Sequence, residues 1–307
     1  MARELIRPAP VRPGDPVRVI APSGPVFADA FAAGAAILSA RYQPRYDPAM
    51  LFHAEGYLAG SDESRLEDLR SALQDADVRA VFMGRGGYGL LRILRDIDQN
   101  LLRENPKVMV GFSDGTALLA AAACAGLAAI HGPVVTQLGR LPDEDRAALF
   151  SLLESSEPRA LLVGLEELRP GSASGPLLGG NLEVFSRLLG TQFLPDTKGA
   201  ILFLEEVGER PYRVDRLLTH LELAGIFEQV AAVVMGDLID CDEPATSRLA
   251  SPSATEVVRE RLGRLNIPVA LGARVGHGDR NIALPYGTRA VLDTREGILV
   301  ALEGAVL

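Results

Sequence analysis

The sequence predicts an α/β fold with two domains: a parallel-sheet α/β domain at residues 1–165 and a smaller, β-rich α+β domain at residues 166–307. Three observations lead to this prediction. Short apolar runs alternate with helical segments through the first half of the chain, which is typical of a mostly parallel sheet. Glycine-rich turns follow several of these runs. The second half consists mainly of short β-type segments.

In the N-terminal half, predicted strands and helices follow one another in a regular order. The helix after Ser61 shows the pattern most clearly, with acids in its first turn and leucines at helical spacing. The predicted strands are 17–22, 78–83 and 107–112, and the predicted helices are 28–40, 61–75, 90–97 and 116–123. Ligands bind outside the carboxyl ends of parallel strands, so we expect the turns after the last two strands to face one cleft.

The pattern loosens between residues 142 and 180. Residues 168–176 are rich in Gly, Pro and Ser, and we expect this stretch to link the two domains. The strands expected after it are 200–204, 230–235, 268–271, 289–292 and 298–301. A single amphipathic helix lies among them, with Val214, Leu217, Leu218 and Leu221 on one face.

The composition indicates a soluble globular protein, and it leaves room for a small anionic substrate. The 307 residues are 48% hydrophobic and 23% charged, and the net charge of −9 argues against nucleic acid or an anionic membrane as the main partner. Cys124 and Cys241 are too few for a disulfide framework or a zinc site. The first eight residues show no secretory signal, and no stretch approaches the roughly 18 apolar residues of a membrane span. We therefore expect a cytoplasmic protein.

The turn at residues 111–115, Gly-Phe-Ser-Asp-Gly, carries the first candidate for catalysis. It places Ser113 between the end of an apolar strand and the start of a helix, so the hydroxyl is expected to project from a sharp turn. The helix behind it directs N–H groups and a partial positive charge toward the same point. This arrangement suits a nucleophile, although Ser113 or Asp114 at this position can also be a simple helix N-cap.

The loop at residues 84–89, Gly-Arg-Gly-Gly-Tyr-Gly, matches the dinucleotide-binding pattern and has two interpretations. It follows a strand and opens a helix, and Asp114 at the next strand end is a candidate acid for a ribose. However, the motif does not follow the first strand, and Asp114 is further away than the usual roughly 20 residues. Alternatively, the glycines present bare N–H groups to a developing oxyanion.

A serine nucleophile needs a base and an acid that orients the base. Of the four histidines, His277 is our first choice because flanking glycines leave room for a substrate. His53 and His220 have no special context, and His131 at a strand end either lines the cleft or orients a turn. Glu205 and Glu206 end a strand and are candidate acids, although paired glutamates are also found simply solvated. The order serine, acid, histidine is that of the α/β-hydrolases.

Taken together, these segments resemble the serine LD-carboxypeptidase family, which includes muramoyl-tetrapeptide carboxypeptidases and microcin C self-immunity peptidases. The resemblance extends over nearly the whole chain, through residues 13–17, 21–24, 56–62, 85–89, 111–114, 131–133, 179–182, 205–206, 212–216, 276–277 and 284–287. It implies a flavodoxin-like N-terminal domain, a β-rich C-terminal domain, an active site between them and a homodimer. It implies no cofactor and no metal.

Position by position, the resemblance implies Ser113 as nucleophile, His277 as general base and Glu205 as the orienting acid. The oxyanion hole would consist of backbone N–H groups of Asp114 and of Gly86 or Gly87. Arg85 and Tyr88 are candidate substrate-binding residues, and Arg85 is placed to meet a terminal carboxylate.

The implied reaction is hydrolysis of the amide before a C-terminal D-amino acid, with D-alanine of a murein tetrapeptide as the expected leaving group. The alternatives are a microcin C-type peptidyl-nucleotide immunity peptidase, another serine hydrolase such as an esterase, and a dinucleotide-binding protein. The absence of tryptophan removes the simplest platform for a nucleotide and favours the murein peptide. Gly115 departs from the family pattern, which has a larger residue; it either loosens the helix start by about 1 kcal/mol or makes room for a different substrate group.

Overall fold

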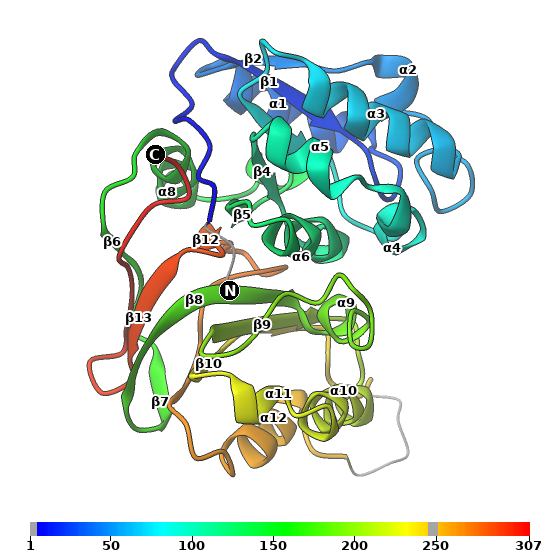
Figure 1. Cartoon of the computed structure of the whole chain (residues 1–307). Helices are drawn as coiled ribbons and strands as arrows, with labels where there is room; N and C mark the ends of the chain where they lie inside the picture. The colour runs from blue at the N-terminus through cyan, green and yellow to red at the C-terminus, as the bar shows by residue number, and fades with distance from the viewer. Residues whose placement is uncertain (1–4, 245–250) are drawn as a thin grey trace.

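The computed structural model describes residues 5–244 and 251–307 and contains two β-sheets, one above the other in Figure 1. Residues 1–4, which belong to the segment where we expect no secretory signal, lie outside the described residues. The first sheet consists of β1 (Pro16–Ile20), β2 (Gln43–Arg45), β3 (Ala80–Met83), β4 (Val108–Gly111), β5 (Ala129–His131) and β12 (Leu284–Tyr286). Its order is β12-β5-β4-β3-β1-β2, and only β12 is antiparallel to its neighbour. The order 2-1-3-4-5 of the parallel strands is the flavodoxin-like order, as expected.

Helices cover both faces of this sheet. They are α1 (Ala28–Ser39), α2 (Pro48–Leu51), α3 (Asp62–Gln74), α4 (Leu90–Ile93), α5 (Gln99–Glu104), α6 (Thr116–Cys124), α7 (Val135–Leu138) and α8 (Asp143–Glu154), with 3-10 turns η1 (Leu94–Asp96) and η2 (Ser113–Gly115). None of the helices in the described ranges has the length and apolar character needed to cross a membrane. The helix expected at residues 90–97 lies where it was predicted. Its first half is the α-helix α4 and its second half is the 3-10 turn η1.

The second sheet has eight strands and confirms the β-rich character expected of the C-terminal half. They are β6 (Arg159–Val163), β7 (Glu166–Arg169), β8 (Ser172–Asn181), β9 (Ile201–Val207), β10 (Ala232–Ile239), β11 (Val269–Leu271), β13 (Arg289–Asp293) and β14 (Ile298–Ala301). The order is β6-β14-β13-β8-β9-β10-β11-β7, with β8 to β11 parallel. On the outer face pack α9 (Leu182–Ser186), α10 (Pro211–Leu223), α11 (Ile226–Gln229) and α12 (Ala254–Leu262).

The expected linker at residues 168–176 is wrong, because this stretch is the end of β7, a turn and the start of β8. The turn uses Gly171, whose φ of +147° is a conformation that glycine adopts easily. Strand β8 then continues into the buried residues that pair with β9. The predicted domain boundary at 165/166 stays a prediction; β6 pairs with β14 in the second sheet, and β12 returns to the first.

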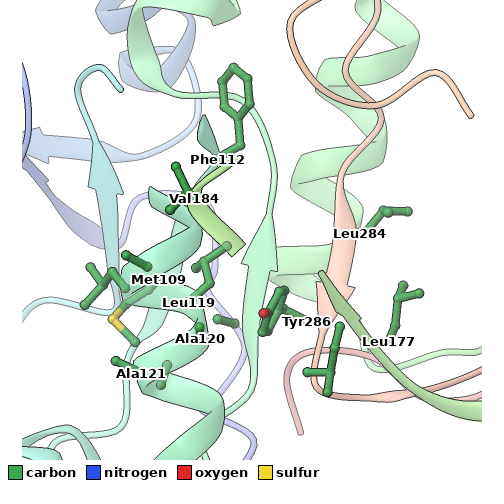
Figure 2. Packing of buried hydrophobic residues seen from close by; sticks show 14 of the residues in the cluster. Met109, Phe112, Leu119, Ala120, Ala121, Leu177, Val184, Leu284 and Tyr286 are labelled. Carbon is green, nitrogen blue, oxygen red and sulfur yellow. The ribbon is translucent and has the colours of Figure 1, made fainter. Parts of the chain in front are cut away.

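A continuous apolar core joins the two sheets. Helix α6 lies between them, and seven of its nine residues are fully covered, which explains its alanine-rich sequence without a polar face. Figure 2 shows Leu119 and Ala120 of this helix, with Leu177 of β8 and Tyr286 of β12 close by. The same core carries the turn at the start of α6 and so fixes the position of Ser113.

Gly115 packs closely against Met83 beneath that turn. Its φ of −56° is an ordinary helical value, so conformational freedom does not explain the glycine. A Cβ at this position would lie 2.6 Å from the Sδ atom of buried Met83. The space beside Gly115 is therefore filled by Met83, and the expectation that it makes room for a substrate group is wrong.

We predict that Gly115→Ala lowers the free energy of unfolding by about 1–3 kcal/mol, the usual cost of overpacking, despite the better helix propensity of alanine. Urea unfolding measures the change. When the Met83→Ala variant already removes the sulfur, adding Gly115→Ala is expected to cost nothing further. A Gly115→Ala protein as stable as the wild type would contradict this account.

Candidate active site

Ser113 sits on a strained turn between β4 and α6. Its φ of 61° lies in the left-handed region, which a non-glycine residue seldom adopts. The preceding Phe112 is extended, and η2 leads directly into α6. The capping residues of η2 and α6 are Phe112 and Gly115, and neither makes a side-chain capping hydrogen bond, so the N-cap interpretation of Ser113 or Asp114 is wrong. Such a strained strand–turn–helix is the local geometry of a nucleophile elbow.

The structure brings Ser113, His277 and Glu205 together although they are far apart in the sequence. The Nε2 atom of His277 lies 3.0 Å from Ser113 Oγ, and its Nδ1 atom lies 2.7 Å from Glu205 Oε2. Glu205 is fully buried on β9, whereas Ser113 and His277 are partly exposed. The neighbouring Gly276 has a φ of +112°, and a Cβ there would lie 2.3 Å from the Glu205 carboxylate. Only glycine therefore lets the loop place His277 against Glu205.

The other histidines lie elsewhere. His131 is fully buried between the rings of Phe112 and Phe203, so it does not line the cleft. Burial lowers the pKa of His131 to about 3, which keeps its ring neutral at physiological pH. His53 and His220 are exposed and take no part in this cluster.

Glu206 points away from His277, and its hydrogen bonds connect the second sheet to α9. Its carboxylate accepts hydrogen bonds from the Asn181 side chain at 3.0 Å and from the backbone N–H of Glu183 at 2.8 Å. Burial raises the pKa of Glu206 to about 7, with a contribution from neighbouring Glu205. Asn181 in turn donates its backbone N–H to the hydroxyl of Thr116 on α6. Glu206 is therefore part of a chain of contacts that connects β9 to the first turn behind Ser113.

A polar network that sequence reasoning missed holds the loop carrying His277. The Gln137 side chain on α7 donates to the Gly276 carbonyl at 3.0 Å and accepts from Asn281 at 2.7 Å. Asn281 also accepts the N–H of Gly276 at 3.0 Å, and Arg140 donates to the His277 carbonyl at 3.3 Å. The contacts of Gln137 and Arg140 join the loop to the N-terminal half of the chain, and the Asn281–Gly276 bond closes the loop on itself. No motif marks the contacts of Gln137 and Arg140, because their partners are more than 130 positions away in the sequence.

A second set of contacts anchors the far end of the same loop. Arg280 forms a salt bridge with Asp145 on α8, and Asp145 also accepts the backbone N–H of Asn281 at 3.0 Å. Asp145 is fully buried. Breaking such a pair leaves an uncompensated charge in the interior, which is strongly unfavourable. The loop is thus fixed at both ends on the N-terminal half.

The cleft above these residues has a volume of about 410 Å³ and is lined by the glycine loop as well as by Ser113 and His277. Gly86 packs directly on the serine, since a Cβ there would lie 2.9 Å from Ser113 Oγ. The guanidinium-bearing residues Arg85 and Arg140 line the same cleft. The expectation that the two strand-end turns face one cleft is confirmed. Tyr88 lines an adjoining pocket together with Arg85.

The geometry does not suit a dinucleotide. The Asp114 carboxylate is buried, accepts the N–H of Leu90 at 2.8 Å, and has a pKa raised chiefly by burial. It is therefore not placed to bind a ribose. The helix after the glycine loop, α4, has only four residues and offers little dipole to a pyrophosphate. Among the described residues, no group of three or more His, Cys, Asp or Glu side chains is placed to hold a metal ion, and Cys124 and Cys241 are free thiols.

Comparison with known proteins shows similarity over most of the chain. Family models of the LD-carboxypeptidase N-terminal and C-terminal domains match residues 17–132 and 174–292. The murein tetrapeptide carboxypeptidase of Pseudomonas aeruginosa is 37% identical over 251 residues, covering 77% of this chain and 80% of that protein.

Two solved structures have the same fold. The muramoyltetrapeptide carboxypeptidase from Oxalobacter formigenes has a TM-score of 0.80 at 28% identity, over 93% of this chain and 97% of that one. The microcin C7 self-immunity protein MccF in complex with glutamyl sulfamoyl guanosine has a TM-score of 0.88 at 22% identity, over 98% and 99% of the two chains. The matched domains and the identity to the Pseudomonas enzyme show that the chain belongs to the LD-carboxypeptidase family.

Proposed function

We propose that this LD-carboxypeptidase removes the C-terminal D-alanine from murein tetrapeptide, with Ser113 as nucleophile, His277 as general base and Glu205 as the acid that orients the base. The observation that supports this most directly is the pair of contacts at His277, 3.0 Å to Ser113 and 2.7 Å to Glu205. A nucleophile, a base within hydrogen-bonding distance and a third group that orients the base form the geometry of serine hydrolysis.

In the proposed reaction, Ser113 attacks the carbonyl carbon before the terminal D-alanine while His277 Nε2 takes the hydroxyl proton. Glu205 holds the other ring nitrogen as N–H and stabilises the imidazolium that forms. The N–H groups of Asp114 and of Gly86 or Gly87 stabilise the tetrahedral oxyanion. His277 then gives its proton to the leaving amine, and D-alanine departs. Water, activated by His277, hydrolyses the acyl-enzyme and restores the Ser113 hydroxyl.

The packing of the glycine loop supports this assignment of the oxyanion hole. Gly86 lies against Ser113 with no side chain between them, and Gly86 and Gly87 both line the cleft. Donors that are fixed before the reaction begins stabilise the developing charge without reorganisation, which is usually the largest single contribution to catalysis.

The murein peptide is favoured as substrate by the named activities of the Pseudomonas and Oxalobacter relatives. Arg85 and Arg140 give the cleft a local positive charge on a chain whose net charge is −9, which suits the terminal carboxylate of a peptide. The MccF-like fold makes a peptidyl-nucleotide the second candidate substrate, as in a related family member. The family resemblance also leads us to propose that the protein is a cytoplasmic homodimer. Sedimentation equilibrium would measure the mass of the assembly.

We predict that Ser113→Ala lowers the rate of D-alanine release from murein tetrapeptide at least about a thousandfold, because no other hydroxyl replaces the nucleophile. Mass spectrometry of the released amino acid measures the rate. Circular dichroism of the variant controls for folding. Undiminished release by the variant, or no release by the wild type, would refute the proposal.

We predict that the two adjacent glutamates respond differently to the same substitution. Glu205→Gln is expected to lower kcat by about 10³–10⁴, because an amide cannot stabilise the imidazolium of His277. Glu206→Gln, whose side chain contacts Asn181 and α9 instead, is expected to change kcat less than tenfold while lowering stability. Steady-state kinetics and urea unfolding separate the two effects. Equal losses of kcat in both variants would show that the assignment of roles is wrong.

We predict that Gln137→Leu lowers kcat by about 10²-fold with little change in KM. The variant loses two hydrogen bonds to the loop, so the His277 ring shifts slightly away from Ser113. Gln229→Leu is the control for loss of a glutamine side-chain hydrogen bond, since Gln229 accepts from Thr197 and does not line the cleft. If both glutamine variants have the same kcat, the network does not position the base.

A further inference from the structure

A pocket with aromatic walls adjoins the cleft that contains Ser113. It has a volume of about 710 Å³, within the range of about 300–1,000 Å³ that is typical of ligand sites. Phe27, Tyr57 and Tyr88 line it and are 55%, 65% and 45% exposed. These are three of the four strongly exposed aromatic residues in the described ranges; the fourth is Tyr212 on α10. Exposed apolar side chains that gather at one place mark a binding surface.

The pocket and the cleft share two of their lining residues. Arg85 and Gly87 line both spaces, and Gly87 directly follows Gly86, which packs on Ser113. The guanidinium of Arg85 lies 5.2 Å from the centre of the Phe27 ring and donates to the Pro25 carbonyl at 3.0 Å. No carboxylate among the described residues forms an ion pair with it, so its remaining donors are available to a ligand that spans both spaces.

The shape and chemistry of the pocket suit a sugar ring better than an amino-acid side chain or a flat base. The pocket is far larger than one side chain, and its tyrosines supply hydroxyl groups next to apolar ring faces, as a pyranose requires. The rings of Tyr57 and Tyr88 are tilted by 57° with their centres 5.8 Å apart, so they do not form two parallel faces around a base. Arg85 covers one face of Phe27, and the ring remains 55% exposed for contact with a single sugar ring.

We infer that this pocket is a subsite for the muramoyl sugar of a muramoyl-peptide substrate, with Tyr57 and Phe27 as its stacking residues. The inference rests on the proposed function. In a muramoyl-tetrapeptide that loses its last residue, three residues separate the sugar from the scissile amide, and they span at most roughly 10–13 Å, about 3.5 Å for each residue and slightly more where a side-chain carboxyl forms the link. The sugar therefore falls beside the cleft, where Arg85 and Gly87 connect it to the pocket.

The test compares muramoyl-tetrapeptide with the same tetrapeptide lacking the sugar. The measured quantity is the ratio of the two kcat/KM values for D-alanine release. We expect the wild type to favour the muramoyl substrate at least tenfold, and Tyr57→Ala or Phe27→Ala to lower this ratio about tenfold, mainly through KM. Tyr212→Ala removes an exposed tyrosine on α10, outside the pocket, and is expected to leave the ratio unchanged.

Calorimetric titration of the Ser113→Ala protein with both peptides gives the same comparison without turnover. Failure of the wild type to release D-alanine from either peptide would refute the proposed function, and the titration would still decide the subsite. Equal binding of the two peptides, or a ratio unaffected by Tyr57→Ala, would overturn the sugar subsite. Tighter binding of a peptidyl-nucleotide than of the muramoyl-peptide would overturn it as well.

Discussion

The position of the His277 ring depends on contacts from both sheets, and the geometry of the whole site depends on that position. Glu205 on the second sheet binds one ring nitrogen, while the other meets Ser113 at the end of β4 in the first sheet. The site is therefore complete only when the sheets are docked. The continuous core around α6, the return of β12 to the first sheet and the Thr116–Asn181 hydrogen bond all maintain that docking. The contacts that hold the two sheets together therefore stabilise the fold and also position the residues of the proposed reaction.

Close backbone approach explains why so many glycines surround a site with few reactive side chains. Gly86 lets the loop contact Ser113, and Gly276 lets the His277 loop contact Glu205, each at a distance that a Cβ would block. Ser113 itself adopts a left-handed conformation that is costly for serine. The buried contact of Met83 with Gly115 supports the turn from beneath.

The sequence allowed prediction of much of the fold because local patterns govern it. Apolar runs, helix starts and glycine turns led to the parallel sheet and to the turn at Ser113, and the family resemblance distinguished Glu205 from Glu206. Prediction failed where distant residues decide the structure. Residues 168–176 were predicted as a linker because they are rich in Gly, Pro and Ser, yet pairing with β11 and β13 places all but the turn at 170–171 in strands. No sequence pattern marks Gln137 and Asn281, because their hydrogen bonds form only when α7 packs against the His277 loop.

The central claim is that His277 and Glu205 activate Ser113 for covalent attack on a peptide amide. Its most direct test is mass spectrometry of the intact protein mixed with murein tetrapeptide and quenched within milliseconds. The account predicts a transient mass increase equal to the tripeptide acyl group, located on the peptide that contains Ser113 and absent from His277→Ala. An adduct on another residue, or D-alanine release at full rate without any adduct in a protein that lacks the Ser113 hydroxyl, would contradict it.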